Sequence, residues 1–200
     1  FLFRALVVEN SAYPTENRTP FEIATSGIGQ SSIVASPMHM CMVAAAIAND
    51  GVMMEPRLLM NVRSATGTTR TTYQSKAYRT ALPADDAATL QAYMRDVVTS
   101  GTGTRAAVPG LTICGKTGSA ESSLAGSDVT YGWFVGYIEN PDLPYAVSIL
   151  VESIEDGEGG GSTAAPIAAD IFKYLRTLPL GIPPEALPLD SAKGHSALSK

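Results

Sequence analysis

Two apolar runs in the second half of the chain place the tightest constraint on its fold. Residues 133–138 (WFVGYI) and 145–151 (YAVSILV) are rich in aromatic and β-branched residues, which favours strands. The link between them, residues 139–144, is short and rich in turn-forming residues, which suits an antiparallel hairpin. A further strand-like run, residues 111–114, precedes them. This half of the chain therefore predicts an antiparallel sheet.

Three segments have the composition and boundaries of helices. Residues 38–48 follow a Ser-Pro pair at 36–37, typical of a helix start, and end at the Asn-Asp-Gly stop of 49–51. Because this segment is apolar apart from His39, we expect a helix buried nearly all round, with its three methionines filling the core. Residues 85–99 and 164–175 predict two further helices. Helices together with an antiparallel sheet predict an α+β fold.

The remaining segments are less regular. Residues 57–63 (RLLMNVR) predict a strand, and residues 64–80, rich in Thr, Ser and Arg, predict either a hairpin or a connecting loop. Residues 155–162 (EDGEGGGS) predict a flexible acidic loop. We expect residues 1–178 to form part of one domain, and residues 179–200, with four prolines and few apolar anchors, to form a tail.

Composition and charge exclude several classes of protein. Hydrophobic residues make up 45% of the 200 residues and charged residues 16%, which is too apolar and too sparsely charged for a disordered chain. The formal net charge is −5 and the 14 basic residues are scattered, which argues against a nucleic-acid partner. The two cysteines make no disulfide framework, and no apolar run is long enough to span a bilayer.

Residues 110–117 (GLTICGKT) satisfy the nucleotide-binding pattern G-x-x-x-x-G-K-[ST]. A phosphate-binding loop of this kind needs a strand before its first glycine and a helix that starts at its lysine. Here a Pro-Gly loop precedes the pattern, its four middle residues favour a strand, and no helical periodicity follows Lys116. We therefore reject a nucleotide site, although ATP binding with Mg²⁺ would support an NTPase.

The same residues read better as Lys-Thr-Gly-Ser on an edge strand, the K-T-G motif of penicillin-interacting serine enzymes. Alone the tripeptide is weak, but it stands among six segments in a specific order. They are SGIGQ (26–30), SPMHM leading to ANDG (36–51), GTGT (101–104), GKTGSAE (115–121), GWFVGY (132–137) and GG ahead of AAP (160–166). In these segments the chain resembles the C-terminal part of the transpeptidase domain of class B penicillin-binding proteins, which cross-link peptidoglycan. The resemblance covers about residues 22–176.

The resemblance implies a partial β-lactamase/transpeptidase-like fold of α+β character, with an antiparallel sheet flanked by helices. It implies serine acyl transfer on peptidoglycan stem peptides that end in D-Ala-D-Ala, and binding of β-lactams. It also implies membrane anchoring, a site of action at the extracytoplasmic face of the bacterial membrane, and a role in cell shape. We expect no cofactor and no metal, because His39 and His195 are the only histidines.

The candidate site residues are Lys116, Thr117, Gly118 and Ser119. A substrate with a terminal carboxylate needs a nearby positive charge, which Lys116 offers, and hydroxyl donors, which Thr117 and Ser119 offer. Gly118 leaves room for the substrate backbone to approach the strand. The resemblance further implies that the backbone N–H of Ser119 forms half of the oxyanion hole, a donor worth on the order of 10²–10³ in rate.

Three other positions are weaker candidates for a place in the functional site. The turn Gly29-Gln30-Ser31 forms either part of a substrate-facing loop or, as we favour, only the turn before a helix. We expect His39 to be a core or helix-surface residue and not a catalytic base. Trp133 comes close to Lys116 if their strands pair, with core packing as its default role.

Two of the family's three catalytic motifs are absent from the 200 residues. No Lys has a Ser three positions before it, as S-x-x-K requires, and no Asn has a Ser two positions before it, as S-x-N requires. In the family both lie upstream, so the Met-less start at Phe1 suggests an excised piece. We therefore expect the upstream part of the same protein as a partner, and an exposed apolar face capable of self-association.

Other functions remain open at this point. A serine β-lactamase or a β-lactam sensor shares the K-T-G strand, and a non-catalytic binding module could retain the carboxylate site. Deacylation of a penicillin adduct by the parent protein would favour the β-lactamase. The sequence upstream of Phe1 would decide between an enzyme and a binding module.

We predict that the isolated chain forms no covalent adduct with a fluorescent penicillin, because it contains no S-x-x-K nucleophile. The measurement is fluorescence of the denatured chain on a gel. A stoichiometric, heat-stable adduct would contradict the prediction.

Overall fold

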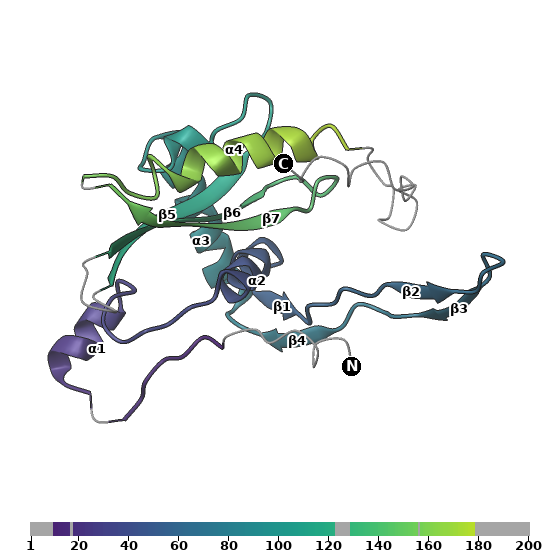
Figure 1. Cartoon of the computed structure of the whole chain (residues 1–200), viewed down its shortest axis with the longest axis horizontal. Helices are drawn as coiled ribbons and strands as arrows, with labels where there is room; N and C mark the ends of the chain where they lie inside the picture. Colours follow the sequence, from purple (N-terminus) through teal and green to yellow (C-terminus); the bar gives the residue numbers. More distant parts are fainter. Residues whose placement is uncertain (1–9, 17, 123–128, 156, 179–200) are drawn as a thin grey trace, which may run out of the picture.

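A three-stranded antiparallel sheet forms the centre of the molecule (Figure 1). The computed structural model describes residues 10–16, 18–122, 129–155 and 157–178. The strands are β5 (Ile113–Ser122), β6 (Val129–Ile138) and β7 (Ala146–Ile154), and they pair in chain order. The predicted antiparallel sheet is therefore confirmed. Its first strand is longer than expected, so Lys-Thr-Gly-Ser lies inside β5 and not at its end.

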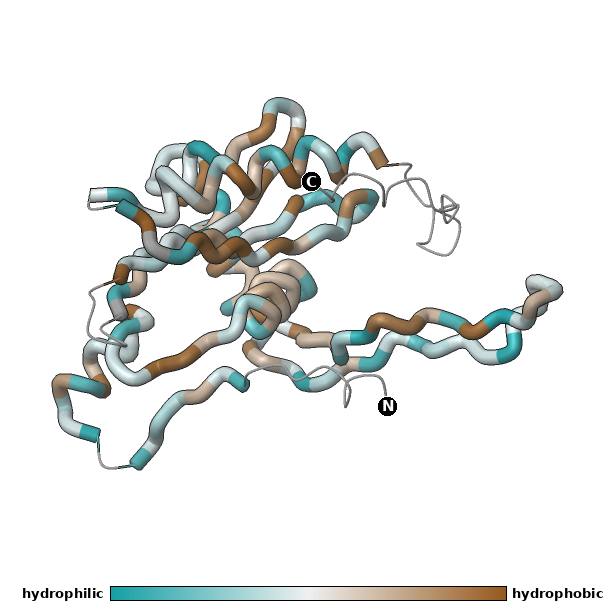
Figure 2. Tube along the Cα trace, viewed as in Figure 1, coloured by the Kyte–Doolittle hydropathy of each residue, from teal (hydrophilic) through white to brown (hydrophobic). Residues whose placement is uncertain are grey.

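Helices cover both faces of this sheet. Helix α4 (Ala164–Leu175) packs on one face, and α2 (Pro37–Ala48) packs on the other, with α3 (Ala84–Thr99) against β5 (Figure 1). All three predicted helices are present, and the α+β fold class is confirmed. Figure 2 shows hydrophobic residues concentrated along the sheet and the elements that pack on it. Each face of the sheet thus has its own core.

The core under α4 depends on small residues facing a large ring. Four buried alanines and Phe172 line the inner side of α4 and contact Phe134 of β6. Two glycines leave space for the Phe134 ring: a Cβ at Gly115 would lie 2.3 Å from its Cζ, and one at Gly136 would lie 2.8 Å from its Cε1. Such interlocking gives interiors their high packing density.

Helix α2 is less buried than its composition predicts. The Ser36 side chain accepts a hydrogen bond from the His39 backbone N–H, as expected of an N-cap. Only Ala44, Ala46 and Ile47 are fully buried, while the methionines are half-buried and His39 is exposed. The expectation of a helix buried all round was wrong, because one side of α2 meets the sheet and the opposite side has no covering layer among the described residues.

Residues 52–80 form an extended hairpin that projects from the domain (Figure 1). Its base is β1 (Val52–Met54) paired with β4 (Ala77–Thr80), and its outer part is β2 (Asn61–Arg63) paired with β3 (Thr69–Thr72). The hairpin alternative for residues 64–80 is therefore correct. The expected strand 57–63 shrinks to its last three residues, and Leu58 is 63% exposed, because no second layer from the described part of the chain packs on this apolar run.

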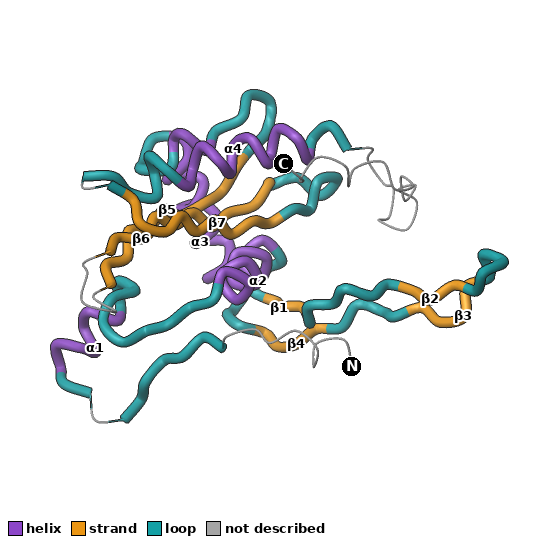
Figure 3. The backbone as a smooth tube through the Cα atoms, in the orientation of Figure 1, coloured by secondary structure: helices purple, strands orange, loops and turns teal. Residues whose placement is uncertain are grey.

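A short helix, α1 (Pro20–Ser26), was not expected. Thr19 and Glu22 form a capping box around its first turn, and Pro20 occupies its first position. The connection from α1 to α2 is irregular and lies beside one end of the sheet (Figure 3).

A short 3₁₀ segment, η2 (Thr104–Ala106), follows α3. The proposed tail 179–200 lies outside the described residues.

Truncating the ring of Phe172 tests the core under α4. Phe172→Ala should lower the free energy of unfolding by about 3–5 kcal/mol, because this ring is fully buried. Tyr174→Ala on the same helix is the matched control and should change it by no more than about 0.5 kcal/mol, since Tyr174 is 65% exposed. Urea unfolding measures both variants, and equal losses would contradict this description of α4.

Candidate functional site

Strand β5 is an edge strand, so one of its long sides is unpaired within the described sheet. On its other side it pairs with β6, where Gly118 lies opposite Trp133 and Lys116 opposite Val135. The strands that carry Lys116 and Trp133 therefore do pair. The K-T-G segment lies at the accessible border of a rigid sheet, where a ligand can approach both its backbone and its side chains.

The side chains of the K-T-G segment alternate between the two faces of the sheet. Residues directly opposite each other in an antiparallel pair share a face. Lys116 therefore lies on the side of α2, as does Tyr137, which packs with Ile47. Thr117 lies opposite Phe134 and so on the side of α4, together with Ser119. The charge and the two hydroxyls thus approach the strand edge from opposite faces.

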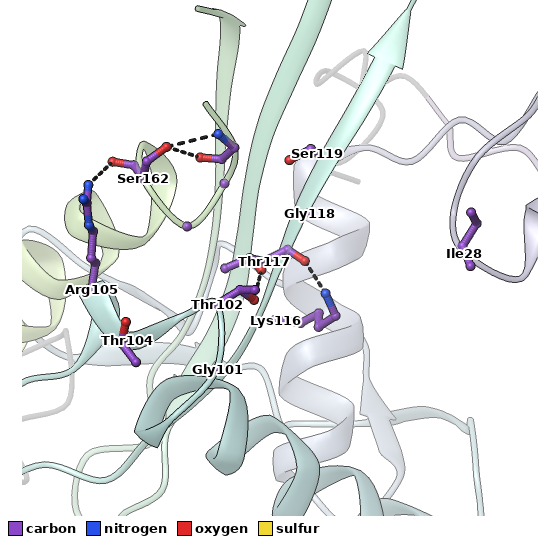
Figure 4. Close-up of a pocket in the computed structure, with 13 residues that line it drawn as sticks. Ile28, Gly101, Thr102, Thr104, Arg105, Lys116, Thr117, Gly118, Ser119 and Ser162 are labelled. Carbon is purple, nitrogen blue, oxygen red and sulfur yellow. Dashed lines mark hydrogen bonds between the residues drawn. The ribbon is translucent and has the colours of Figure 1, made fainter. Parts of the chain in front are cut away.

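A cavity of about 620 Å³ lies against this strand (Figure 4). Four separate segments of the sequence line it, and all four candidate residues are among the lining residues. The lining residues are Ile28; Gly101, Thr102, Thr104 and Arg105; Lys116, Thr117, Gly118 and Ser119; and Gly159, Gly160, Gly161 and Ser162. The GTGT, KTGS and GG segments singled out in the sequence therefore meet at one site.

Hydrogen bonds connect the cavity walls around Thr117. Its hydroxyl lies 2.6 Å from that of Thr102, which ties the GTGT loop to β5 (Figure 4). The Lys116 ammonium donates to the backbone oxygen of Thr117 at 2.5 Å. Thr117 is 8% exposed, whereas Lys116 and Ser119 are exposed to solvent. The site therefore has a fixed hydroxyl pair with an accessible cation and an accessible serine beside it.

The glycines ahead of α4 let a loop lie directly on the strands. A Cβ on Gly160 would lie 1.9 Å from the backbone oxygen of Trp133 and 2.5 Å from that of Gly118. A Cβ on Gly161 would lie 2.4 Å from the backbone oxygen of Thr102. Side chains are excluded at these positions by backbone atoms that cannot move aside, which explains why this wall of the cavity is built from glycine.

The turn before α2 also reaches the site. The Gln30 side-chain amide donates to the backbone oxygen of Ser119 at 3.2 Å, and Ile28, which is 78% exposed, lines the cavity. The turn therefore lies against the K-T-G strand, and its interpretation as part of a substrate-facing loop stays a prediction. Both residues belong to the SGIGQ segment (26–30) singled out in the sequence, but only the fold shows that this turn lies against β5.

The nearby cysteine does not suit nucleophilic chemistry. Cys114 is fully buried, and burial raises the pKa of its thiol, so it stays protonated near neutral pH. The adjacent Arg95 and Glu139 form an ion pair that joins α3 to the end of β6.

Among the described residues, no three His, Cys, Asp or Glu side chains gather in a way that could hold a metal ion. Within the same residues, no helix has both the length and the apolar character needed to cross a bilayer.

Three features can be compared with known families: the antiparallel sheet, the glycine-rich loop ahead of α4, and the K-T-G segment on the edge of β5. The family described as penicillin binding protein transpeptidase domain matches residues 5–173, and the chain belongs to this family. The recognition made from the six sequence segments is therefore confirmed, as is the corresponding partial fold.

Particular relatives sharpen this assignment. The chain is 34% identical over 160 residues to the peptidoglycan D,D-transpeptidase PbpA of Mycolicibacterium smegmatis, covering 77% of this chain and 32% of that protein. It is 30% identical over 166 residues to the peptidoglycan D,D-transpeptidase MrdA of Acinetobacter baumannii, covering 76% and 24%. The chain thus spans about a third or less of the length of these relatives.

Solved structures show the same fold. Penicillin-binding protein A from M. tuberculosis, as an imipenem acyl-enzyme complex, superposes with a TM-score of 0.72 at 26% identity, covering 86% of this chain and 38% of that one. The D,D-transpeptidase domain of a peptidoglycan glycosyltransferase from Eggerthella lenta superposes with a TM-score of 0.60 at 35% identity, covering 72% and 33%.

Substituting the glycines ahead of α4 tests the packing of the cavity wall. Gly160→Ala should lower the free energy of unfolding by about 1–3 kcal/mol and shift the amide resonances of residues 116–119, because its Cβ meets two backbone oxygens. Gly159→Ala is the matched control, since its Cβ meets only the rotatable Ser119 hydroxyl, at 2.7 Å. Urea unfolding and amide NMR spectra compare the two, and indistinguishable variants would contradict the packing described.

Proposed function

We propose that this chain forms the carboxylate-binding and oxyanion-binding wall of a peptidoglycan D,D-transpeptidase, which cross-links stem peptides by serine acyl transfer and also binds β-lactams. One observation carries the proposal: residues 116–119 lie on the unpaired edge of β5 and line a cavity with three other segments. The relatives named peptidoglycan D,D-transpeptidases support it.

The orientation of the backbone at Ser119 supports an oxyanion-binding role. In an antiparallel strand, the N–H and C=O of one residue point to the same side. The Ser119 carbonyl accepts from Gln30, on the side away from β6, so its N–H also faces the unpaired edge. A donor fixed in this way stabilises the negative charge that develops on a reacting carbonyl oxygen, without the cost of reorganising at the moment of reaction.

The side chains around this edge fit a terminal carboxylate. The hydroxyl of Thr117 can accept from Thr102 and still donate to a ligand, because a hydroxyl both accepts and donates. Ser119 provides a second hydroxyl on the same face, and Lys116 provides the charge from the other face. Gly118 places no side chain between them, and a Cβ there would lie 3.3 Å from the Cβ of Trp133. These features support Lys116, Thr117, Gly118 and Ser119 as the substrate-binding residues.

The nucleophile is proposed to lie in the upstream part of the same protein, because the 200 residues contain neither S-x-x-K nor S-x-N. That part is also the expected partner of this chain, and anchoring at the extracytoplasmic face of the membrane belongs to the same proposal. Residues 1–178 would form the C-terminal portion of the domain and 179–200 a tail. A family match over residues 5–173 favours a transpeptidase over a β-lactamase or sensor.

Removing the cation tests the proposed carboxylate site. In the full-length protein that contains this chain, Lys116→Met should slow acylation by penicillin about 10- to 150-fold, the loss of one hydrogen bond to a charged group. Lys173→Met on α4 is the matched control, since Lys173 is exposed and paired with Asp170, and should acylate normally. Stopped-flow or gel-based acylation kinetics measure both variants. Equal rates for Lys116→Met and the unmodified protein would contradict the proposal.

A further inference from the structure

The Gln30 side chain occupies the edge of β5 at the point where a ligand would bind. Its amide nitrogen donates to the Ser119 carbonyl at 3.2 Å across a sequence separation of 89 residues. The other carbonyl on this side, that of Thr117, accepts from the Lys116 ammonium. Both outward-facing carbonyls of the K-T-G segment are therefore bound by side chains of the chain itself.

An extended peptide that adds to a strand edge exchanges hydrogen bonds with alternate residues of that strand. At Ser119 it would accept from the backbone N–H and donate to the backbone carbonyl. The primary amide of Gln30 already fills the second of these positions, and it has the same donor and acceptor groups as a peptide unit. The ligand and Gln30 thus compete for one acceptor.

The turn that carries Gln30 does not depend on this bond. The Gln30 backbone N–H donates to the Thr25 carbonyl at 3.1 Å, which ties the turn to α1. The flanking residues Gly29 and Ser31 have φ angles of 78° and 77°, so the chain bends sharply on both sides of Gln30. The side chain can therefore leave Ser119 while the turn keeps its shape.

We propose that Gln30 is a displaceable cap on the substrate-binding edge, which ligands with a backbone-like amide N–H must move aside before they bind. The inference rests on the proposed function, because it assumes that substrate adds to β5. Ligands of this class include the extended end of a peptide and β-lactams with an acylamino side chain. Gln30 is a positioning residue in this scheme and takes no part in bond making or breaking.

The test compares two β-lactams on the full-length protein that contains this chain. Penicillin G has an acylamino N–H, whereas imipenem has none. Gln30→Met keeps the length of the side chain and removes its donor, so the second-order acylation rate with penicillin G should rise about fivefold, the factor of one ordinary hydrogen bond. With imipenem the rate should change less than about twofold, since it has no acylamino N–H to compete with Gln30.

The controls separate capping from a merely structural role. Gln74→Met changes an exposed glutamine of the projecting hairpin and should leave both rates unchanged. A slower acylation rate with penicillin G for Gln30→Met, or an equal change in rate with both compounds, would overturn the capping role. Gln30→Ala also removes the donor and should likewise speed acylation by penicillin G and not by imipenem. If the unmodified protein is not acylated by either compound, the proposed function itself fails, and the capping role fails with it.

Discussion

The pairing of β5 on one side only is the constraint on which the rest of the structure depends. Strand β6 holds β5 in register over ten residue pairs, and the ring of Phe134 locks the two strands together across Gly115 and Gly136. The loop ahead of α4 then lies on the same strands, because glycine at position 160 leaves room for two backbone oxygens. With its position fixed on these sides, β5 presents one open edge.

Placing the charge and the hydroxyls on opposite faces of β5 has a chemical effect. Thr117 is held by the GTGT loop on the side of α4, whereas Lys116 extends on the side of α2 and donates to a backbone oxygen of its own strand. A ligand at the edge can be contacted from both sides at once. A donor that a second element holds in place, as Thr102 holds Thr117, can act without reorganising.

Much of the fold was predictable because its signals are local. The apolar runs 133–138 and 145–151 and their short link predicted the hairpin of β6 and β7, and the K-T-G order predicted the cavity lining on β5. The approach of Gln30 to Ser119 could not be predicted, since a bond between residues so far apart depends on the whole fold. The burial of α2 was overestimated because composition does not reveal how many layers surround a helix.

The order of the strands along the chain also has a kinetic consequence. Strands β5, β6 and β7 pair with their sequence neighbours, so two successive hairpins make up the central sheet. Local pairings of this kind cost little loop entropy and tend to form early in folding. The contact between Gln30 and Ser119 spans 89 residues and closes a long loop. During folding, the edge of β5 should therefore form before the turn that carries Gln30 docks against it, and the cavity should be completed late.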